Sequence, residues 1–162
     1  MKNIKIISRT VLAITLLMTN AANAQKLEFE LLYKIDLSLE PRIELGKTPV
    51  GTRVIYTVKG GTFEGPKLKG KVRPVGGDWV LRLDSLTTKL DVRLLLETDD
   101  GQLISNTYTG FVRNNPDGST YWRITPVFET SSKKYAWLNY LIAVGVGKFG
   151  EHGPSYEVYA IK

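Results

Sequence analysis

The 162-residue chain contains no cysteine and only one histidine, His152. The absence of cysteine excludes disulfides, thiolate nucleophiles and cysteine-ligated metals, so the fold depends on its hydrophobic core. A single histidine also excludes a metal site with several imidazole ligands, and a Ser-His-Asp triad would have to use that one residue. We therefore expect no metal and no cofactor.

The chain also has little apolar sequence of the length that crosses a membrane. Its one long apolar run, residues 11–18, is interrupted only by Thr15, follows three basic residues and precedes a small-x-small site at 22–24. This is the pattern of a secretory signal peptide cleaved after Ala24. A membrane anchor is the alternative, but spanning hydrocarbon of about 30 Å needs about 20 residues. No stable membrane insertion is expected, and the lack of cysteine excludes a lipid anchor.

The charge of the chain is only modestly basic once the first 24 residues are set aside. The full sequence has 22 Lys and Arg against 16 Asp and Glu. Removing the three basic residues of the leader leaves 19 against 16, a net charge of +3. This excess does not indicate a nucleic-acid partner. Residues 25–162 are long enough for one domain that buries about two-thirds of its surface.

The mature part of the chain reads as β-strands. Residues 27–37 alternate between apolar and polar side chains, with Leu27, Phe29 and the apolar residues at 31, 33, 35 and 37 on one face. Strong turn signals at 99–101 and 114–118 indicate hairpins. The other strands are expected at 52–58, 68–72, 78–83, 88–98, 102–112, 120–128, 138–147 and 155–161.

Residues 59–70 hold four glycines and one proline between two of these strands. Such a cluster is typical of a sharp corner in a closed or strongly coiled sheet. No amphipathic helix longer than about two turns is visible; one short helix or 3-10 turn is expected near 131–137. The sequence thus predicts an all-β protein, a single antiparallel barrel of about eight strands over residues 25–162.

Several short motifs, taken together, resemble a known family. They are Leu45-Gly46-Lys47-Thr48-Pro49, Gly60-Gly61-Thr62-Phe63-Glu64-Gly65-Pro66, Gly76-Gly77-x-Trp79, Leu90-Asp91-x-Arg93, Thr98-Asp99-Asp100-Gly101, Tyr121-x-Arg123, Phe128-Glu129-Thr130, Tyr135-x-Trp137-Leu138-Asn139 and Val144-Gly145-Val146-Gly147. In this order they resemble family 3237 of the domains of unknown function, over nearly all of the mature chain. The resemblance implies a small calycin-like barrel. It assigns no activity, although relatives in natural-product pathways make small-molecule binding or isomerisation an expectation.

The strand at 88–98 carries the main candidate site. Asp91, Arg93 and Glu97 share one face of this strand. The apolar side chains at 90, 92, 94 and 96, three of them leucine, share the other face. The simpler interpretation is that the leucine face forms the core and the charged face meets water. The functional interpretation is that the charged face lines a pocket, where an arginine and carboxylates bind a carboxylate or enolate. Because Asp91 and Arg93 are two residues apart on one strand, we expect cross-strand partners rather than a direct pair.

Other polar and aromatic residues complete this candidate site. Arg123 and Glu129 lie at matching parity on or next to the strand at 120–128. Aromatic rings at a barrel mouth could stack a flat ligand, although most pack in the core. The proposed ligand-binding set is Asp91, Arg93, Glu97, Tyr108, Tyr121, Arg123, Glu129, Trp137 and Asn139.

Three functions follow from these patterns. The leading hypothesis is an exported barrel, periplasmic or secreted, that binds a small organic ligand bearing a carbonyl or carboxylate. A metal-independent isomerase or lyase, with a carboxylate base and an arginine electrophile, is the second. A structural envelope protein with a filled barrel is the third.

The leader predicts a defined mature N-terminus. Mass analysis of the exported protein should find a chain that begins at Gln25. Recovery of the chain from the cytosol with Met1 retained would contradict the export prediction.

Overall fold

The computed structural model describes residues 26–162, which form nine β-strands and one 3-10 helix. The predicted signal peptide, residues 1–24, lies outside the described residues. The elements are β1 (Phe29–Leu39), β2 (Ile43–Thr48), β3 (Gly51–Glu64), β4 (Lys69–Arg82), β5 (Thr87–Thr98), β6 (Leu103–Asn114), β7 (Thr120–Glu129), η1 (Ala136–Tyr140), β8 (Ala143–Phe149) and β9 (Pro154–Ile161).

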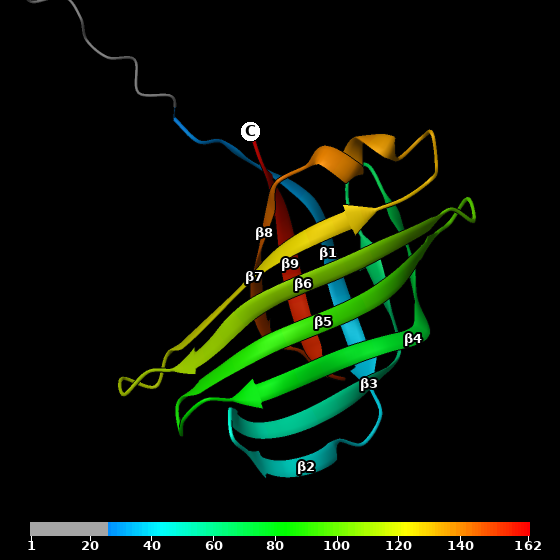
Figure 1. Cartoon of the computed structure of the whole chain (residues 1–162). Coiled ribbons are helices and arrows are strands. Elements are labelled where there is room, and N and C mark those ends of the chain that lie inside the picture. Colours follow the sequence, from blue (N-terminus) through cyan, green and yellow to red (C-terminus); the bar gives the residue numbers. More distant parts are fainter. Residues whose placement is uncertain (1–25) are drawn as a thin grey trace, which may run out of the picture.

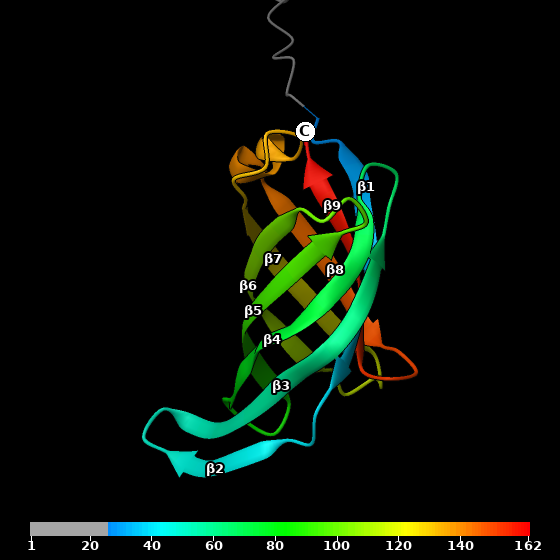
Figure 2. The ribbon, with the colours of Figure 1, turned by 90° about the vertical axis from the view of Figure 1, so that its right-hand side faces the viewer.

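The strands form a closed antiparallel barrel (Figure 1). Neighbouring strands run from β1 through β9, β8, β7, β6, β5 and β4 to β3, and β3 pairs back with β1. Eight strands therefore close the barrel, as predicted. The ninth, β2, pairs with the first part of β3 and extends from one end of the barrel as an arm (Figure 2).

The inward face of β1 is set by alternation and by one bulge. Tyr33, Ile35 and Leu37 point into the barrel and are nearly inaccessible to solvent. The pairing of β1 with β9 shifts between Leu31 and Tyr33, so that alternation does not continue through this point. Phe29 is therefore 59% exposed. The prediction that it shares the buried face was wrong because alternation alone does not reveal a bulge.

The glycine cluster lies where β3 bends from one neighbour to another. The first part of β3 pairs with β2, and its second part pairs with β1. Gly61 has φ of +151°, and a Cβ atom there would collide with the carbonyl oxygen of Asp36. A Cβ atom on Gly65 would likewise meet the carbonyl oxygen of Leu32. The glycines therefore let the two backbones approach closely enough to close the barrel.

η1 covers one end of the barrel (Figure 1). Buried side chains fill the interior beneath it. Tyr33 packs edge-to-face against Phe63 and Phe128, with ring centroids 5.7 and 6.2 Å away. Leu138 of η1 is fully buried. The presence of η1 at 136–140 confirms the short helix or 3-10 turn expected near 131–137. The strand expected from residue 138 begins only at Ala143, because residues 136–140 form η1 instead.

Two leucines near the filled end should differ in how much they contribute to stability. Leu96 is fully buried, whereas Leu103 on the neighbouring strand is 53% exposed. Leu96→Ala should lower the free energy of unfolding by about 2–5 kcal/mol, because it leaves a cavity in the core. Leu103→Ala should change it by less than about 0.5 kcal/mol. Urea denaturation measures both, and equal effects would contradict this description of the core.

Candidate functional site

The other half of the barrel interior is an open cavity of about 610 Å³. It lies at the end of the barrel opposite η1. Its walls come from all eight strands of the barrel and the loops between them. The lining side chains include Leu39, Tyr56, Asp78, Val80, Thr88, Leu90, Val112 and Trp122, while Arg82, Asp84, Asn114 and Phe149 line the cavity from exposed positions. Most of these side chains are apolar or aromatic, so the polar groups among them decide what the cavity can recognise.

Strand β4 carries the polar groups Asp78 and Arg82 into this cavity. Asp78, Val80 and Arg82 alternate along the strand and share its inward face. Trp79, between them, faces outward and is 37% exposed. The register of β4 against β5 shifts between Val72 and Gly76. This shift determines which residues of β4 point inward beyond Gly77.

Asp78 is a carboxyl held in a desolvated position. Its Oδ1 accepts a hydrogen bond from the backbone N–H of Asp91 at 3.1 Å. Burial raises the pKa of Asp78 to about 6, and the nearby Asp91 carboxylate adds to the rise. The Asp91 N–H and the Arg53 guanidinium oppose this shift. Asp78 therefore changes its protonation near neutral pH, as a proton-transferring group must.

Three buried aromatic residues lie close together in this part of the interior. The ring centroid of Tyr156 is 5.5 Å from that of Tyr108 and 5.5 Å from that of Trp122. Burial raises the pKa of both tyrosines well above the ordinary value, and the Asp78 carboxylate contributes to each rise. Both side chains therefore stay as neutral phenols. The Trp122 indole nitrogen is buried without a hydrogen-bond partner among the described residues.

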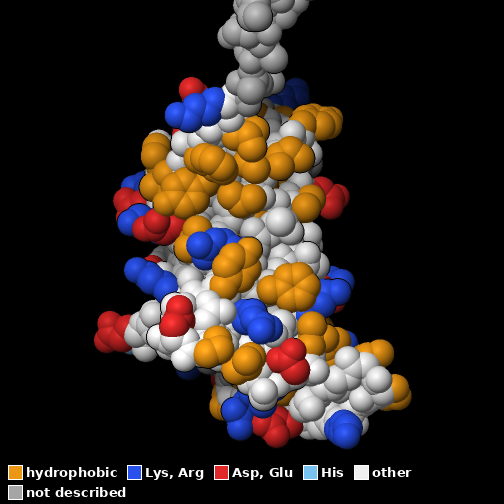
Figure 3. Space-filling view, turned by 90° about the vertical axis from the view of Figure 1, so that its left-hand side faces the viewer, with side chains coloured by type: hydrophobic (Ala, Val, Ile, Leu, Met, Phe, Trp, Pro, Cys, Tyr) orange, Lys and Arg blue, Asp and Glu red, His pale blue; other side chains and the backbone are white. Residues whose placement is uncertain are grey.

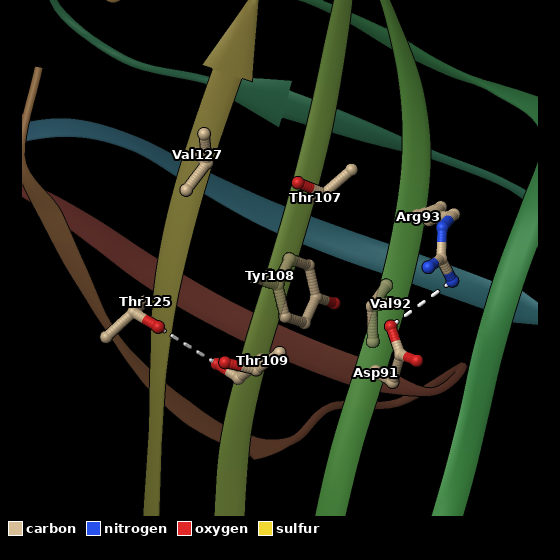
Figure 4. Close-up of a pocket in the computed structure, with 8 residues that line it drawn as sticks. All are labelled: Asp91, Val92, Arg93, Thr107, Tyr108, Thr109, Thr125 and Val127. Carbon is tan, nitrogen blue, oxygen red and sulfur yellow. Dashed lines mark hydrogen bonds and ion pairs between the residues drawn. The ribbon is translucent and has the colours of Figure 1, made fainter. Parts of the chain in front are cut away.

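The structure places Asp91 and Arg93 on the outer wall of the barrel. They line a shallow hollow of about 290 Å³ over β5, β6 and β7 (Figure 4). Arg93 Nη1 lies 3.2 Å from Asp91 Oδ1, and both side chains are about half exposed. The expectation of separate cross-strand partners was therefore wrong for this pair. An exposed pair of this kind contributes about 0–1 kcal/mol.

Most of the other predicted site residues also lie outside. Glu97 contacts Lys71 and Arg73 of β4, at 3.3 and 2.7 Å, and Arg73 contributes most to lowering the pKa of Glu97. Glu129 is exposed, and Trp137 lies under the Lys67 ammonium, 5.7 Å from it.

Three further predicted residues, Asn139, Tyr121 and Arg123, make contacts outside the barrel interior. Asn139 bonds both backbone groups of Thr130, at 2.8 and 2.9 Å, and so holds the chain before η1. Tyr121 and Arg123 stack on each other on the outer wall, with the guanidinium 5.0 Å from the ring centroid.

Of the nine predicted residues, only Tyr108 points into the barrel. The charged face of β5 is the outer face, and Leu90, Val92, Leu94 and Leu96 form the inner one. The functional interpretation that put this charged face inside was wrong, because the leucines fill the interior instead. The sequence analysis missed Asp78 and Arg82, whose strand has apolar residues on both faces and so no clear alternation.

Two further observations concern metals and membranes. Among residues 26–162, no three His, Cys, Asp or Glu side chains come together as ligands for a metal ion. In the same part of the chain, no helix has the length and apolar character needed to cross a bilayer.

The fold and its half-open interior define a class of small antiparallel barrels with one internal cavity. The model of the family described as "Protein of unknown function (DUF3237)" matches residues 27–161. The chain therefore belongs to this family, as its motifs predicted.

Similar proteins come from bacteria and a fungus. The crystal structure of a β-barrel-like protein from Acinetobacter baumannii superposes with a TM-score of 0.83 at 35% identity, covering 87% of this chain and 99% of that one. A UPF0311 protein from Clostridium acetobutylicum is 28% identical over 131 residues, 72% of this chain and 82% of the relative. A hydroalkoxylation enzyme from Penicillium herquei is 28% identical over 117 residues, 72% of this chain and 71% of the enzyme.

The raised pKa of Asp78 predicts a pH-dependent gain in stability for Asp78→Asn. In the native protein the carboxyl holds its proton up to about pH 6, whereas the unfolded chain releases it near pH 3.8. Native stability therefore falls as pH rises from about 4 to 6, and the loss persists above pH 6. Asp78→Asn avoids this loss and keeps an acceptor for the Asp91 N–H. Its free energy of unfolding should exceed the parent's by on the order of 2–3 kcal/mol at pH 7.5, from the shift to about 6.

Urea denaturation at pH 4 and pH 7.5 measures this difference. The gain should disappear at pH 4, where Asp78 is protonated in the native parent. Glu129→Gln, at an exposed position on β7 without an ion pair among the described residues, controls for the loss of one negative charge. A gain for Asp78→Asn that is the same at both pH values would contradict the assignment of a buried, titrating carboxyl.

Proposed function

We propose that this protein binds a small, largely apolar organic molecule in the open half of its barrel and exchanges a proton with it through Asp78. The observation that carries the proposal is a carboxyl of raised pKa inside a cavity of about 610 Å³. A cavity with apolar walls and few polar groups is the usual form of a small-molecule site. A carboxyl whose pKa lies near neutrality is the usual form of a general acid or base.

The polar groups of the cavity suggest what the ligand carries. Asp78 in its protonated form donates a hydrogen bond to a carbonyl oxygen, and Arg82 attracts a carboxylate. Trp122 and Phe149, whose ring centroids are 4.9 Å apart, offer aromatic surface to a flat ligand. The carbonyl- or carboxylate-bearing ligand expected from the sequence is thus kept, but with Asp78 and Arg82 in place of Asp91 and Arg93.

The enzymatic form of the proposal is a redox-neutral isomerisation or addition. Hydroalkoxylation, the activity named for the Penicillium herquei relative, adds an O–H group across a carbon–carbon double bond. One proton goes to carbon and one leaves oxygen, so no net proton is consumed. A protonated Asp78 would supply the first proton, and its carboxylate would then accept the second.

A purely structural role is the third possibility, and the interior argues against it. The end under η1 is filled by Tyr33, Phe63 and Leu138, as a filled barrel requires. The opposite half keeps a cavity with a desolvated carboxyl, which costs stability at neutral pH. Such a cost is typical of a functional site. With the predicted leader removed on export, we infer that the ligand is met in the periplasm or outside the cell.

A pair of matched probes tests the site. 2-Acetylnaphthalene carries a carbonyl, and 2-ethylnaphthalene has a similar shape without it; both are titrated by quenching of tryptophan fluorescence. The carbonyl probe should bind more weakly as pH rises above about 6, by up to about tenfold per pH unit, because Asp78 loses its donor proton. The ethyl probe should show no such dependence, and Asp78→Asn should remove it for the carbonyl probe.

Two tryptophan substitutions locate the binding. Val112→Trp fills the cavity and should abolish binding of both probes, whereas Val127→Trp, at a 62% exposed position on the outer wall, should not. Circular dichroism checks that both variants fold. Full binding by Val112→Trp would overturn the cavity as the site.

A further inference from the structure

An apolar surface lies outside the barrel, where β7 meets β8. Figure 3 views the side on which these two strands lie and shows many apolar side chains gathered there. Phe29, Phe111, Tyr121 and Val146 are between 40% and 59% exposed. Scattered exposed apolar residues are normal, but a contiguous patch of them marks a binding surface.

The strand pairing beneath this surface is weak. β7 and β8 pair only at Arg123 with Val146 and at Ile124 with Gly145, whereas β6 and β7 pair along ten residues of each strand. Pro126, which has no N–H group to donate, lies just beyond the last β7–β8 pair. We call this junction the β7–β8 seam. It is the least extensively paired junction between neighbouring strands of the barrel within the described residues.

A groove of about 510 Å³ crosses the seam. One side comes from β6 and β7, and the other from β8, β9 and the start of β1. The groove is lined mainly by Phe29, Thr109, Phe111, Tyr121, Arg123, Thr125, Val144 and Ile161. Arg123 is the one charged side chain among the lining residues.

Arg123 has no acidic partner in the described part of the chain. None of the ion pairs among residues 26–162 includes it, although Lys67, Lys71 and Arg73 all have carboxylate partners. Its Nη1 donates to the backbone oxygen of Trp122 at 2.8 Å, and its guanidinium stacks on Tyr121. The group is thus held in place, and its remaining N–H donors are available to a ligand.

We propose that this groove binds an amphiphilic carboxylate, with an unbranched alkyl chain along the apolar walls and its head group on Arg123. A held guanidinium with free donors matches a carboxylate bidentately, and the lining offers little else that is polar. A second copy of the chain is the less suitable occupant. A two-fold contact centred here would bring Arg123 against its own symmetry mate, and like charges oppose such an interface.

The placement of the groove gives binding a structural effect. The ligand contacts β6 and β7 on one side of the seam and β8, β9 and β1 on the other. It therefore joins two parts of the barrel wall that only two residue pairs connect directly. Because it binds this closed form, it should stabilise the folded barrel, and the stabilisation should grow with the logarithm of the free ligand concentration once that exceeds Kd.

Calorimetric titration of the full mature chain with dodecanoate tests the proposal, and 1-dodecanol is the uncharged probe of equal chain length. Dodecanoate should bind at least about tenfold more tightly than dodecanol, as expected for a charge-assisted pair. Its affinity should rise roughly fourfold for each added methylene that fits the groove. Saturation should also raise the melting temperature.

Two arginine variants separate this groove from the internal cavity. Arg123→Gln should weaken dodecanoate binding by about tenfold or more and leave dodecanol unchanged. Arg82→Gln, at an exposed position that lines the internal cavity, should change both by less than about twofold. Arg42→Gln, at the exposed ion pair beside β2, controls for the loss of one surface charge. If Arg82→Gln weakens dodecanoate and Arg123→Gln does not, the carboxylate binds in the cavity and the groove proposal is overturned.

Absence of dodecanoate binding would overturn it as well. So would sedimentation showing a dimer that Phe111→Ser dissociates and dodecanoate does not affect, since a second copy would then cover the groove.

Discussion

The close approach of β3 to β1 is the contact on which the rest of this protein depends. It closes the sheet, and only glycine fits where the carbonyl oxygens of Asp36 and Leu32 face β3. Once the sheet is closed, every strand has an inside and an outside, and hydrophobic side chains can be removed from water on one face alone. The bend at these glycines also frees the first part of β3 to pair with β2, which is why one strand stands outside the barrel.

Closure divides the interior into two parts with different physical character. Under η1, large side chains such as Tyr33 and Phe63 meet edge-to-face and fill the space. Toward the other end the side chains leave a cavity, and Asp78 sits there with only partial compensation for its lost hydration. The packed core and the proposed binding site thus lie at opposite ends of one barrel. This separation lets a costly carboxyl be kept without weakening the packed core.

The fold could be predicted from the sequence because the patterns that specify it lie within short stretches of the chain. Alternation in β5 places Leu90, Val92, Leu94 and Leu96 together, and they do form the inner face. The glycines marked the corner, and the motifs indicated the family. The site was harder, because which face of β4 points inward depends on a register shift between Val72 and Gly76. That shift is set by neighbouring strands, so neither Asp78 nor Arg82 could be found from spacing alone.

The residues of the outer wall were assigned to an internal site for a related reason. Asp91 and Arg93 look like a site because they are charged and close in sequence, yet they form an exposed pair on the outer wall. Arg123, stacked on Tyr121, is also on the outer wall. Unlike Arg93, it has no carboxylate partner among the described residues. Arg93 and Arg123 therefore differ in whether a carboxylate neutralises them, although both are exposed. This difference is visible only in three dimensions.

The plug formed by η1 has a kinetic consequence. Leu138 and Tyr135 are buried at that end, so a molecule that entered the proposed cavity from the opposite end would leave by the same route. If the proposed reaction takes place there, a product would block the next molecule until it departs, and two different reactants would have to arrive in a fixed order. A cavity closed at one end would then suit the rearrangement of one molecule better than the joining of two.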